Sequence, residues 1–144
     1  MPRPAPWRLD LEAYPFSDKT ETRFQDLDPL GHINNVAMAA LFENGRVRFN
    51  RTLIHYKRDD QRWLVAAISI NYLDEAQFPA DIVIASGIGD IGRSSWTILS
   101  GAFQHGTCMA TCDTTLVISA PERRRIIDTG FRDALEARRM LQPA

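Results

Sequence analysis

Cysteine and histidine are scarce in this chain, which limits the disulfides and metal sites that it could form. Among 144 residues there are two cysteines, Cys108 and Cys112, and three histidines, His32, His55 and His105. The two cysteines fall in one expected strand, where a rise of about 3.3 Å per residue separates them by ~13 Å, too far for a mutual disulfide. The histidines and cysteines do not have the spacing of zinc ligands. We therefore expect buried structural thiols and no metal site.

Neither sign of charge dominates, and no long apolar run is present. The chain has 17 basic and 18 acidic residues, for a net charge of −1 at pH 7. Such a balance does not favour bulk nucleic-acid or anionic-membrane binding, and it is compatible with self-association. No apolar run approaches the ~20 residues of a membrane-spanning helix, and residues 1–16 have no apolar region typical of a secretory signal. We expect a soluble, cytoplasmic protein without nucleic-acid or membrane partners.

The composition is that of an ordinary globular domain. Hydrophobic residues make up 44% of the chain, enough for a core of normal size. No internal repeat or low-complexity segment divides it, so a single domain over residues 1–144 is predicted. Residues 1–14 contain three prolines and little periodicity. We interpret them as an N-terminal arm that packs on the surface or on a partner subunit.

A helical pattern over about residues 35–56 is the clearest element of the sequence. Its apolar positions spread over more than one side, which predicts burial on several sides. Gly45 in the interior of this helix costs about 1 kcal/mol relative to alanine, which indicates close packing there.

Residues 17–28, before the helix, favour an extended strand. Four strand-like runs and a short amphipathic helix follow, at about residues 64–73, 82–88, 94–104, 108–119 and 131–141. One long buried helix with consecutive antiparallel strands predicts an α+β layered fold.

The junction between the first strand and the helix contains the residues that suggest chemistry. Pro29 biases Asp28 away from the α region, and Gly31 suits a sharp reversal of the chain. Asn34 and Asn35 are good candidates for the helix N-cap. Together they predict a carboxylate beside free amide donors at the positive end of a helix. Such a site can bind a carbonyl oxygen and attack, or activate water against, its carbon.

The same junction carries the longer pattern R-F-x-D-x-D-x-x-G-H-x-N-N, with an acidic residue following in the helix. Its residues are Arg23, Phe24, Asp26, Asp28, Gly31, His32, Ile33, Asn34, Asn35 and Glu43. This pattern resembles that of the hotdog-fold acyl-CoA thioesterases of the 4-hydroxybenzoyl-CoA thioesterase type. The resemblance extends weakly, but in the same order, over most of the chain. It implies a hotdog fold, in which a curved antiparallel sheet of about five strands wraps around one long central helix.

The resemblance implies an acyl-CoA thioesterase, which hydrolyses a thioester to a free acid and coenzyme A without a metal or redox cofactor. Asp28 is then the catalytic carboxylate, as nucleophile on the thioester carbonyl or as base for an attacking water. Without the pattern, a turn or N-cap aspartate would be the simpler interpretation. Asn35 stands where the family's helix amide polarises the thioester oxygen through its backbone N–H, which is compatible with helix capping. Asp26 is expected to be structural.

Gly31, His32 and Met38 are candidate substrate contacts in and after the turn. For His32, orienting the substrate or water and a structural role are equal alternatives. Family members often carry a tyrosine at the position of Met38 and another aromatic residue near Leu41. A flexible methionine makes a less polar and more adaptable wall, which favours an aliphatic over an aromatic acyl group.

For charged residues outside this junction, the sequence supports a functional role less strongly. Arg93 and Ser94 lie in a turn that resembles the family segment meeting coenzyme A, where Arg93 would hold a nucleotide phosphate. An exposed hairpin arginine often has no specific partner. Some hotdog thioesterases use an acidic helix residue such as Glu43, although pairing with Arg46 three residues on is the simpler role. The basic run 123–125 is either a phosphate contact or a solvated charge run.

The resemblance also implies the partners. It predicts an acyl-CoA substrate and a homodimer, with sheets joined edge to edge and active sites at the subunit interface; tetramers also occur. An open sheet edge invites such pairing. Two alternatives remain: a non-catalytic acyl-CoA or acyl-carrier binding protein of the same fold, and a hotdog dehydratase or hydratase. The second is less favoured because the catalytic histidine motif of those enzymes does not occur here.

Overall fold

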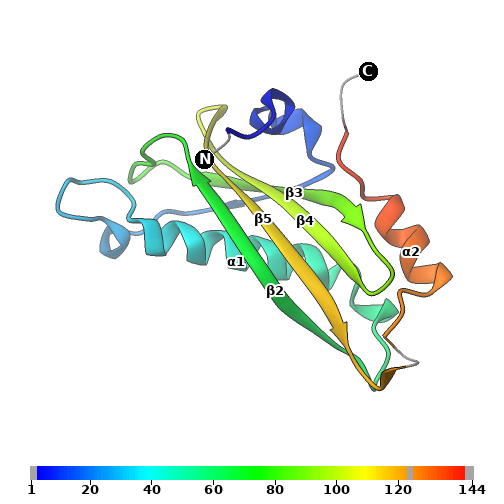
Figure 1. Cartoon of the computed structure of the whole chain (residues 1–144). Helices are drawn as coiled ribbons and strands as arrows, with labels where there is room; N and C mark the ends of the chain where they lie inside the picture. Colours follow the sequence, from blue (N-terminus) through cyan, green and yellow to red (C-terminus); the bar gives the residue numbers. More distant parts are fainter. Residues whose placement is uncertain (1–2, 123–124, 142–144) are drawn as a thin grey trace.

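The computed structural model describes residues 3–122 and 125–141. One long helix, α1 (Asn35–Arg51), packs against a curved five-stranded antiparallel sheet, and a short helix, α2 (Thr129–Glu136), lies beside one end of it (Figure 1). The strands are β1 (Phe16–Thr20), β2 (Arg62–Tyr72), β3 (Ile82–Ile91), β4 (Ser95–Gln104) and β5 (Thr107–Ser119). This is the α+β hotdog architecture that the sequence predicts.

The order of the strands leaves β1 and β2 at the two edges. The sheet runs β1-β3-β4-β5-β2, and every neighbouring pair is antiparallel. After α1 the chain enters β2, which pairs only with the last strand, β5. The C-terminal end of β2 therefore comes back beside the N-terminal end of α1, where the hydroxyl of Tyr72 donates to the carbonyl of Asn35 at 3.0 Å.

The predicted first strand is too long. It ends at Thr20 rather than Asp28, and residues Phe24–Asp26 form a 3₁₀ turn instead. The turn is stabilised by Arg23, whose guanidinium makes two hydrogen bonds to the carboxylate of Asp26, at 2.8 and 3.0 Å. A side-chain pair three residues apart thus overrides the weak polar alternation on which the strand prediction rested.

Both predicted helices are also too long at their C-terminal ends. Helix α1 stops at Arg51, where the hydroxyl of Thr52 donates to the carbonyl of Phe49 at 2.7 Å, and a separate 3₁₀ helix, Ile54–Tyr56, follows. Helix α2 begins at Thr129, two residues before the predicted range of 131–141, and ends at Glu136. Apolar spacing alone did not reveal these breaks, because the apolar pattern continues through them.

The apolar core beneath α1 is divided in two by a row of buried polar side chains. One cluster packs on Met38 and Phe42 in the N-terminal half of the helix and the other on Phe49 near its end. The polar row between them consists of Ser86 and Ser100, which are opposite each other on β3 and β4, and of Thr114 on β5, two residues beyond the partner of Ser100. The hydroxyls of Ser86 and Ser100 are 3.0 Å apart and share a hydrogen bond. The middle of α1 therefore faces a polar strip.

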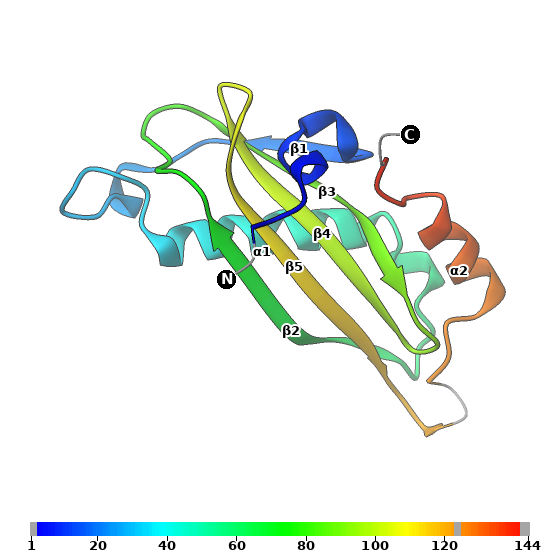
Figure 2. The ribbon, with the colours of Figure 1, turned by 45° about the horizontal axis from the view of Figure 1, so that its top comes forward.

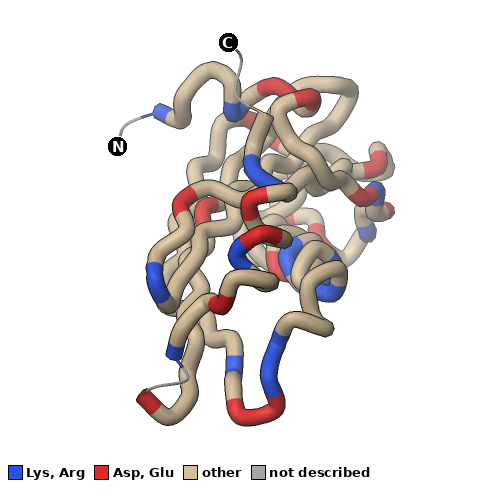
Figure 3. The backbone as a smooth tube through the Cα atoms, turned by 90° about the vertical axis from the view of Figure 1, so that its right-hand side faces the viewer, with Lys and Arg blue, Asp and Glu red and all other residues tan. Residues whose placement is uncertain are grey.

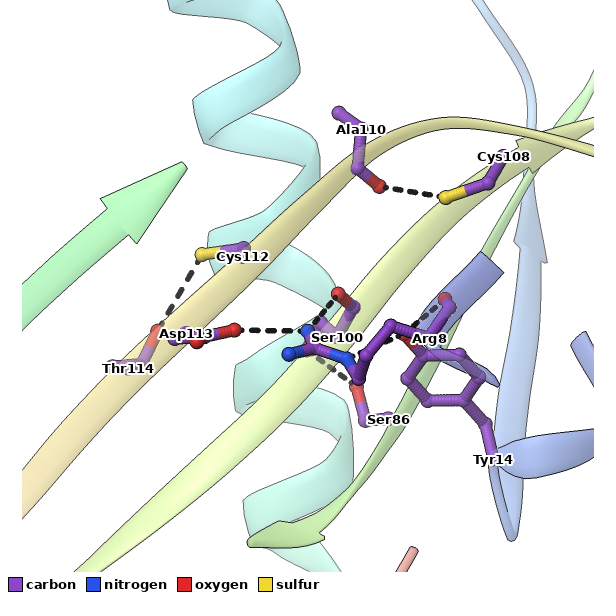
Figure 4. Close-up of polar contacts among 9 residues, drawn as sticks. All are labelled: Arg8, Tyr14, Ser86, Ser100, Cys108, Ala110, Cys112, Asp113 and Thr114. Atoms are coloured by element: carbon purple, nitrogen blue, oxygen red, sulfur yellow. Dashed lines mark hydrogen bonds and ion pairs between the residues drawn. The ribbon is translucent and has the colours of Figure 1, made fainter. Parts of the chain in front are cut away.

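The N-terminal arm packs on the outer face of the sheet, opposite α1, as the rotated view shows (Figure 2). Its anchor is the buried guanidinium of Arg8, which contacts the Asp113 carboxylate at 2.8 Å and donates to the Ser100 carbonyl at 3.1 Å (Figure 4). Arg8 also donates to the hydroxyl of Tyr14, which in turn donates to the Arg8 carbonyl. Two of the three guanidinium nitrogens, Nε and Nη2, therefore have close partners within the chain.

The two cysteines are free and buried, as predicted. Burial raises the pKa of the Cys108 thiol to about 11 and also raises that of Cys112. Both are therefore protonated and unreactive near neutral pH.

Charges of both signs are distributed along the backbone rather than gathered by sign on one side (Figure 3). Within residues 3–122 and 125–141, no cluster of three or more histidine, cysteine or acidic side chains is arranged to hold a metal ion. Over the same residues, no helix has the length and apolar character required to cross a membrane.

Gly45 lies on the side of α1 that packs against β3, and a methyl group there would collide with the side chain of Ile84. We expect Gly45→Ala to destabilise the fold, because overpacking costs about 1–3 kcal/mol and outweighs the ~1 kcal/mol that alanine gains in helix propensity. Asn44→Ala, on the exposed side of the same turn, is the control and should be neutral or slightly stabilising. Urea unfolding measures both. Equal stabilities for the two variants would contradict close packing at Gly45.

Candidate active site

The loop before α1 is fixed by the backbone of Asp26. Its carbonyl accepts hydrogen bonds from both the N–H and the side-chain amide of Asn34, each at 2.8 Å. A backbone bridge between Leu27 and Ile33 closes the loop one residue further in. The Asp26 carboxylate is held by Arg23, whose hydrogen bonds lower the pKa of that carboxyl below its usual value. Asp26 is thus structural, as expected.

Asp28 is the focus of a tight reversal. One of its carboxylate oxygens, Oδ1, accepts from the N–H of Leu30 at 2.9 Å and from the N–H of His32 at 3.1 Å. Its own N–H donates to the carbonyl of His32, and Gly31, with φ +84°, donates back to the Asp28 carbonyl. Within the part of the chain that the structure describes, the second oxygen, Oδ2, has no hydrogen-bond partner. The loop therefore orients the carboxylate through one oxygen and leaves the other available.

The N-terminus of α1 follows immediately. Asn34 is its N-cap, with the side-chain oxygen accepting from the N–H of Ala37 at 2.8 Å. Among the described residues, the N–H groups of Asn35 and Val36 find no acceptor, as is usual for the first turn of a helix. They point outward at the positive end of the helix dipole. The arrangement is a carboxylate beside two free amide donors.

These groups border a pocket of about 270 Å³ between the loop, the start of α1 and the end of β2. Its lining residues are Asp28, His32, Ile33, Asn35, Met38, Tyr72, Leu73, Asp74, Glu75 and Ala76. The imidazole of His32 and the carboxylate of Glu75 meet across it, with Nε2 3.0 Å from Oε2. The pocket thus combines an oriented carboxylate and amide donors with a smaller apolar part, formed by Ile33, Met38, Leu73 and Ala76.

Several predicted site residues meet here. Asp28, His32, Asn35 and Met38 all line the pocket, and Gly31 forms the turn beside it. Sequence reasoning missed the segment from Tyr72 to Ala76, which supplies half of the lining. Its acidic pair, Asp74 and Glu75, directly follows the alternating run of β2, but only the register of the sheet brings it beside α1.

Other predicted residues lie elsewhere. Arg93 and Ser94 form the β3–β4 turn next to α2, at the opposite end of the sheet from the pocket (Figure 1). Glu43 is exposed and pairs with Arg46 at 3.8 Å, away from Asp28. Residues 123 and 124 of the basic run lie outside the described part of the chain, while Arg125 donates to the carbonyl of Ala120.

The Arg23–Asp26 pair predicts a pH dependence of stability. Because the folded pKa of Asp26 is depressed, its contribution is complete above the ordinary carboxyl pKa of ~3.9 and is lost as the pH falls through the folded value. We expect Asp26→Asn to lower the free energy of unfolding at pH 7 and to differ progressively less from wild type in acid. Urea unfolding across this pH range measures the difference, and a pH-independent gap would contradict the charged interaction.

Known structures share this fold over almost the whole chain. A Pseudomonas aeruginosa protein is 24% identical with a TM-score of 0.78, covering 94% of this chain and 99% of its own. A predicted thioesterase from Bacillus stearothermophilus is 24% identical with a TM-score of 0.76, covering 90% and 98%. A thioesterase from Thermus thermophilus, crystallised with coenzyme A and zinc, is 25% identical with a TM-score of 0.76, covering 88% and 95%.

Among curated proteins, none matches this sequence. The model of the thioesterase-like superfamily matches residues 22–138, which include the whole loop, α1 and the sheet except its first strand. The match thus contains every residue of the candidate site. This chain belongs to the thioesterase-like superfamily.

Proposed function

We propose that this protein is an acyl-CoA thioesterase of the 4-hydroxybenzoyl-CoA thioesterase type, with Asp28 as the catalytic carboxylate. The observation that carries the proposal is the geometry of Asp28: Oδ1 is fixed by the N–H groups of Leu30 and His32, while Oδ2, at the wall of the pocket, has no partner among the described residues. The free N–H groups of Asn35 and Val36 adjoin it. The superfamily match and the similarity to a thioesterase crystallised with coenzyme A support this assignment.

In the proposed reaction the thioester oxygen accepts the N–H of Asn35, so that the helix dipole stabilises the negative charge that develops on it. Asp28 then acts in one of two ways. As a nucleophile it forms an anhydride and expels the thiolate, and water hydrolyses the anhydride. As a base it removes a proton from water, which adds to the carbonyl carbon before the carbon–sulfur bond breaks. Both routes consume one water and yield a carboxylic acid and the coenzyme A thiol.

The pocket suits an aliphatic acyl group. Ile33, Met38, Leu73 and Ala76 supply an apolar lining, and Met38 is buried. A thioether side chain adapts to chains of different shape and offers no strong hydrogen bond to a phenol. The acyl group enters this lining while the thioester remains at Asp28.

The proposed active form is a homodimer paired through β2. This edge strand exposes Leu64, Val65, Ile68 and Tyr72, an unusual concentration of large apolar side chains on an unpaired edge. A second copy paired antiparallel to it would form one continuous sheet with two-fold symmetry.

Such pairing would also explain the distant position of Arg93 and Ser94. In an antiparallel β2–β2 pair, the Tyr72 end of one strand lies beside the Trp63 end of the other. The 92–95 turn lies at that same end of the sheet, because the Ser94 carbonyl accepts from Ile118, which pairs with Trp63. The turn of the second copy is thereby directed towards the pocket, where its Arg93 would contact a coenzyme A phosphate.

Asp28→Asn tests the catalytic role directly. The asparagine oxygen can still accept the two loop N–H groups, so we expect the fold to persist while turnover falls at least ~100-fold. Thiol release from a panel of acyl-CoAs measures turnover, and circular dichroism and size-exclusion chromatography check the fold. Unchanged turnover would move the carboxylate role to Glu43, which Glu43→Gln then tests. Binding of acyl-CoA by the wild type without any hydrolysis would favour a non-catalytic binding protein.

Val65→Glu tests the dimer. Val65 is 45% exposed on β2, and Ile54, which is 52% exposed on the 3₁₀ helix after α1, is the matched control. We expect a charge at position 65 to shift the protein towards monomers because it would be desolvated in the paired edge, whereas Ile54→Glu leaves the dimer intact. Light scattering on eluting protein measures the mass. A monomeric wild type at micromolar concentration would refute β2 pairing.

A further inference from the structure

Arg46 is a buried charge with poor partners. Its side chain is 8% exposed in the middle of α1, and its nearest acceptors are the hydroxyl of Thr114 at 3.5 Å and the carboxylate of Glu43 at 3.8 Å. Arg8 is equally buried, with 7% exposure, but makes contacts of 2.8 to 3.1 Å with a carboxylate, a carbonyl and a hydroxyl (Figure 4). A buried guanidinium normally needs such partners. Arg46 therefore has donor capacity that residues 3–122 and 125–141 do not use.

Arg46 faces a second pocket, which follows the first along α1 and β2. This pocket has a volume of about 270 Å³. It is lined by Ala39, Ala40, Phe42, Glu43, Arg46, Ile68, Ile70 and Cys112. The first pocket uses Asn35 and Met38 from α1 and Tyr72 from β2, and the second uses the next turns of the helix and the preceding residues of the strand. The two pockets thus lie one after the other along α1 and β2, although they share no lining residue. A chain long enough to reach from one into the other would occupy both as one groove that begins at Asp28.

The far section of the groove ends against polar groups rather than against the apolar core. Arg46 contacts Thr114, one member of the polar row that separates the two apolar clusters. The sides of the groove are apolar, with Phe42, Ile68 and Ile70 along its length. A ligand that fits this groove has a carbonyl at one end, an aliphatic middle and an anionic group at the other end.

We propose that the acyl group of the substrate carries a second carboxylate at its distal end, and that Arg46 binds this carboxylate. The proposal rests on the proposed thioesterase function and specifies its substrate class as thioesters of dicarboxylic acids. From Asn35 to Arg46 the helix rises about 16 Å, and a helical side chain leans back towards the N-terminus. The two ends of the groove are therefore separated by roughly 10–12 Å, the length of a medium-chain acyl group.

Glu43 does not block this binding. Its carboxylate is 71% exposed, and it lies 3.8 Å from Arg46, beyond hydrogen-bonding distance. An arriving carboxylate would replace this long contact with two parallel hydrogen bonds to the guanidinium. A simple fatty acyl group would instead place a methyl group against the buried charge. The groove therefore discriminates between two chains of equal length by their terminal group.

The test compares octanedioyl-CoA with octanoyl-CoA, together with shorter and longer pairs of the same kind. We expect the wild type to favour the dicarboxylic member of the best-fitting pair by roughly 10- to 100-fold in kcat/KM, the range of a hydrogen-bonded charge. Arg46→Met, of similar length without charge, should abolish this preference. Arg48→Met is the matched control because Arg48 lies on the same helix but pairs with Asp18 at the surface, and it should keep the preference.

Several outcomes would overturn the proposal. A wild type without preference for the dicarboxylic member at any length refutes it, whether or not Arg46→Met folds. An Arg46→Met protein that dissociates into monomers but keeps the preference makes Arg46 an interface residue instead. If no thioester is hydrolysed, the proposed function fails separately, and calorimetric binding of both esters still decides the role of Arg46. Tighter binding of octanedioyl-CoA by wild type than by Arg46→Met would then support it.

Discussion

The hydrogen bonds of Asn34 are the interaction on which the candidate site depends. Its side-chain oxygen caps α1 by accepting from Ala37, while its N–H and side-chain amide both donate to the carbonyl of Asp26. One residue thus joins the start of the helix to the loop that carries Asp28. Because the cap satisfies the third N–H of the helix and leaves the first two free, the same geometry that stabilises α1 also supplies the amide donors.

The middle of α1 packs against polar as well as apolar side chains of the sheet. Gly45 brings the helix close to β3, and the neighbouring Arg46 meets Thr114 in the polar row. Burying a serine pair and an arginine costs free energy that an aliphatic row would not. The outer face shows how the same chain gives a buried arginine closer partners, at Arg8. The incomplete satisfaction of Arg46 is therefore a local property of the groove.

The sequence predicts those site residues whose positions are set by residues close to them in the chain. It does not predict those brought together by the pairing register of the strands. Asp28 and Asn34 were predictable because the turn and the cap are set within a few positions of each other. The contribution of Tyr72 to the pocket was not, since it requires the antiparallel crossing of β2 beside α1. The polar row was equally hidden: Ser86 interrupts an alternating apolar run, but only strand pairing aligns it with Ser100.

Strand β2 contributes both to the candidate site and to the proposed dimer. Its side chains line the pockets, and its free edge is the proposed dimer contact. One side of the strand, through Ile70 and Tyr72, forms a wall of both pockets, whereas its free edge offers unpaired backbone groups. In the proposed dimer, pairing at that edge would cover the groove and exclude water from the distal section, which strengthens any ion pair that Arg46 makes there. Assembly and substrate selection would then depend on the same strand, and a change that loosens the edge would weaken the selectivity as well as the dimer.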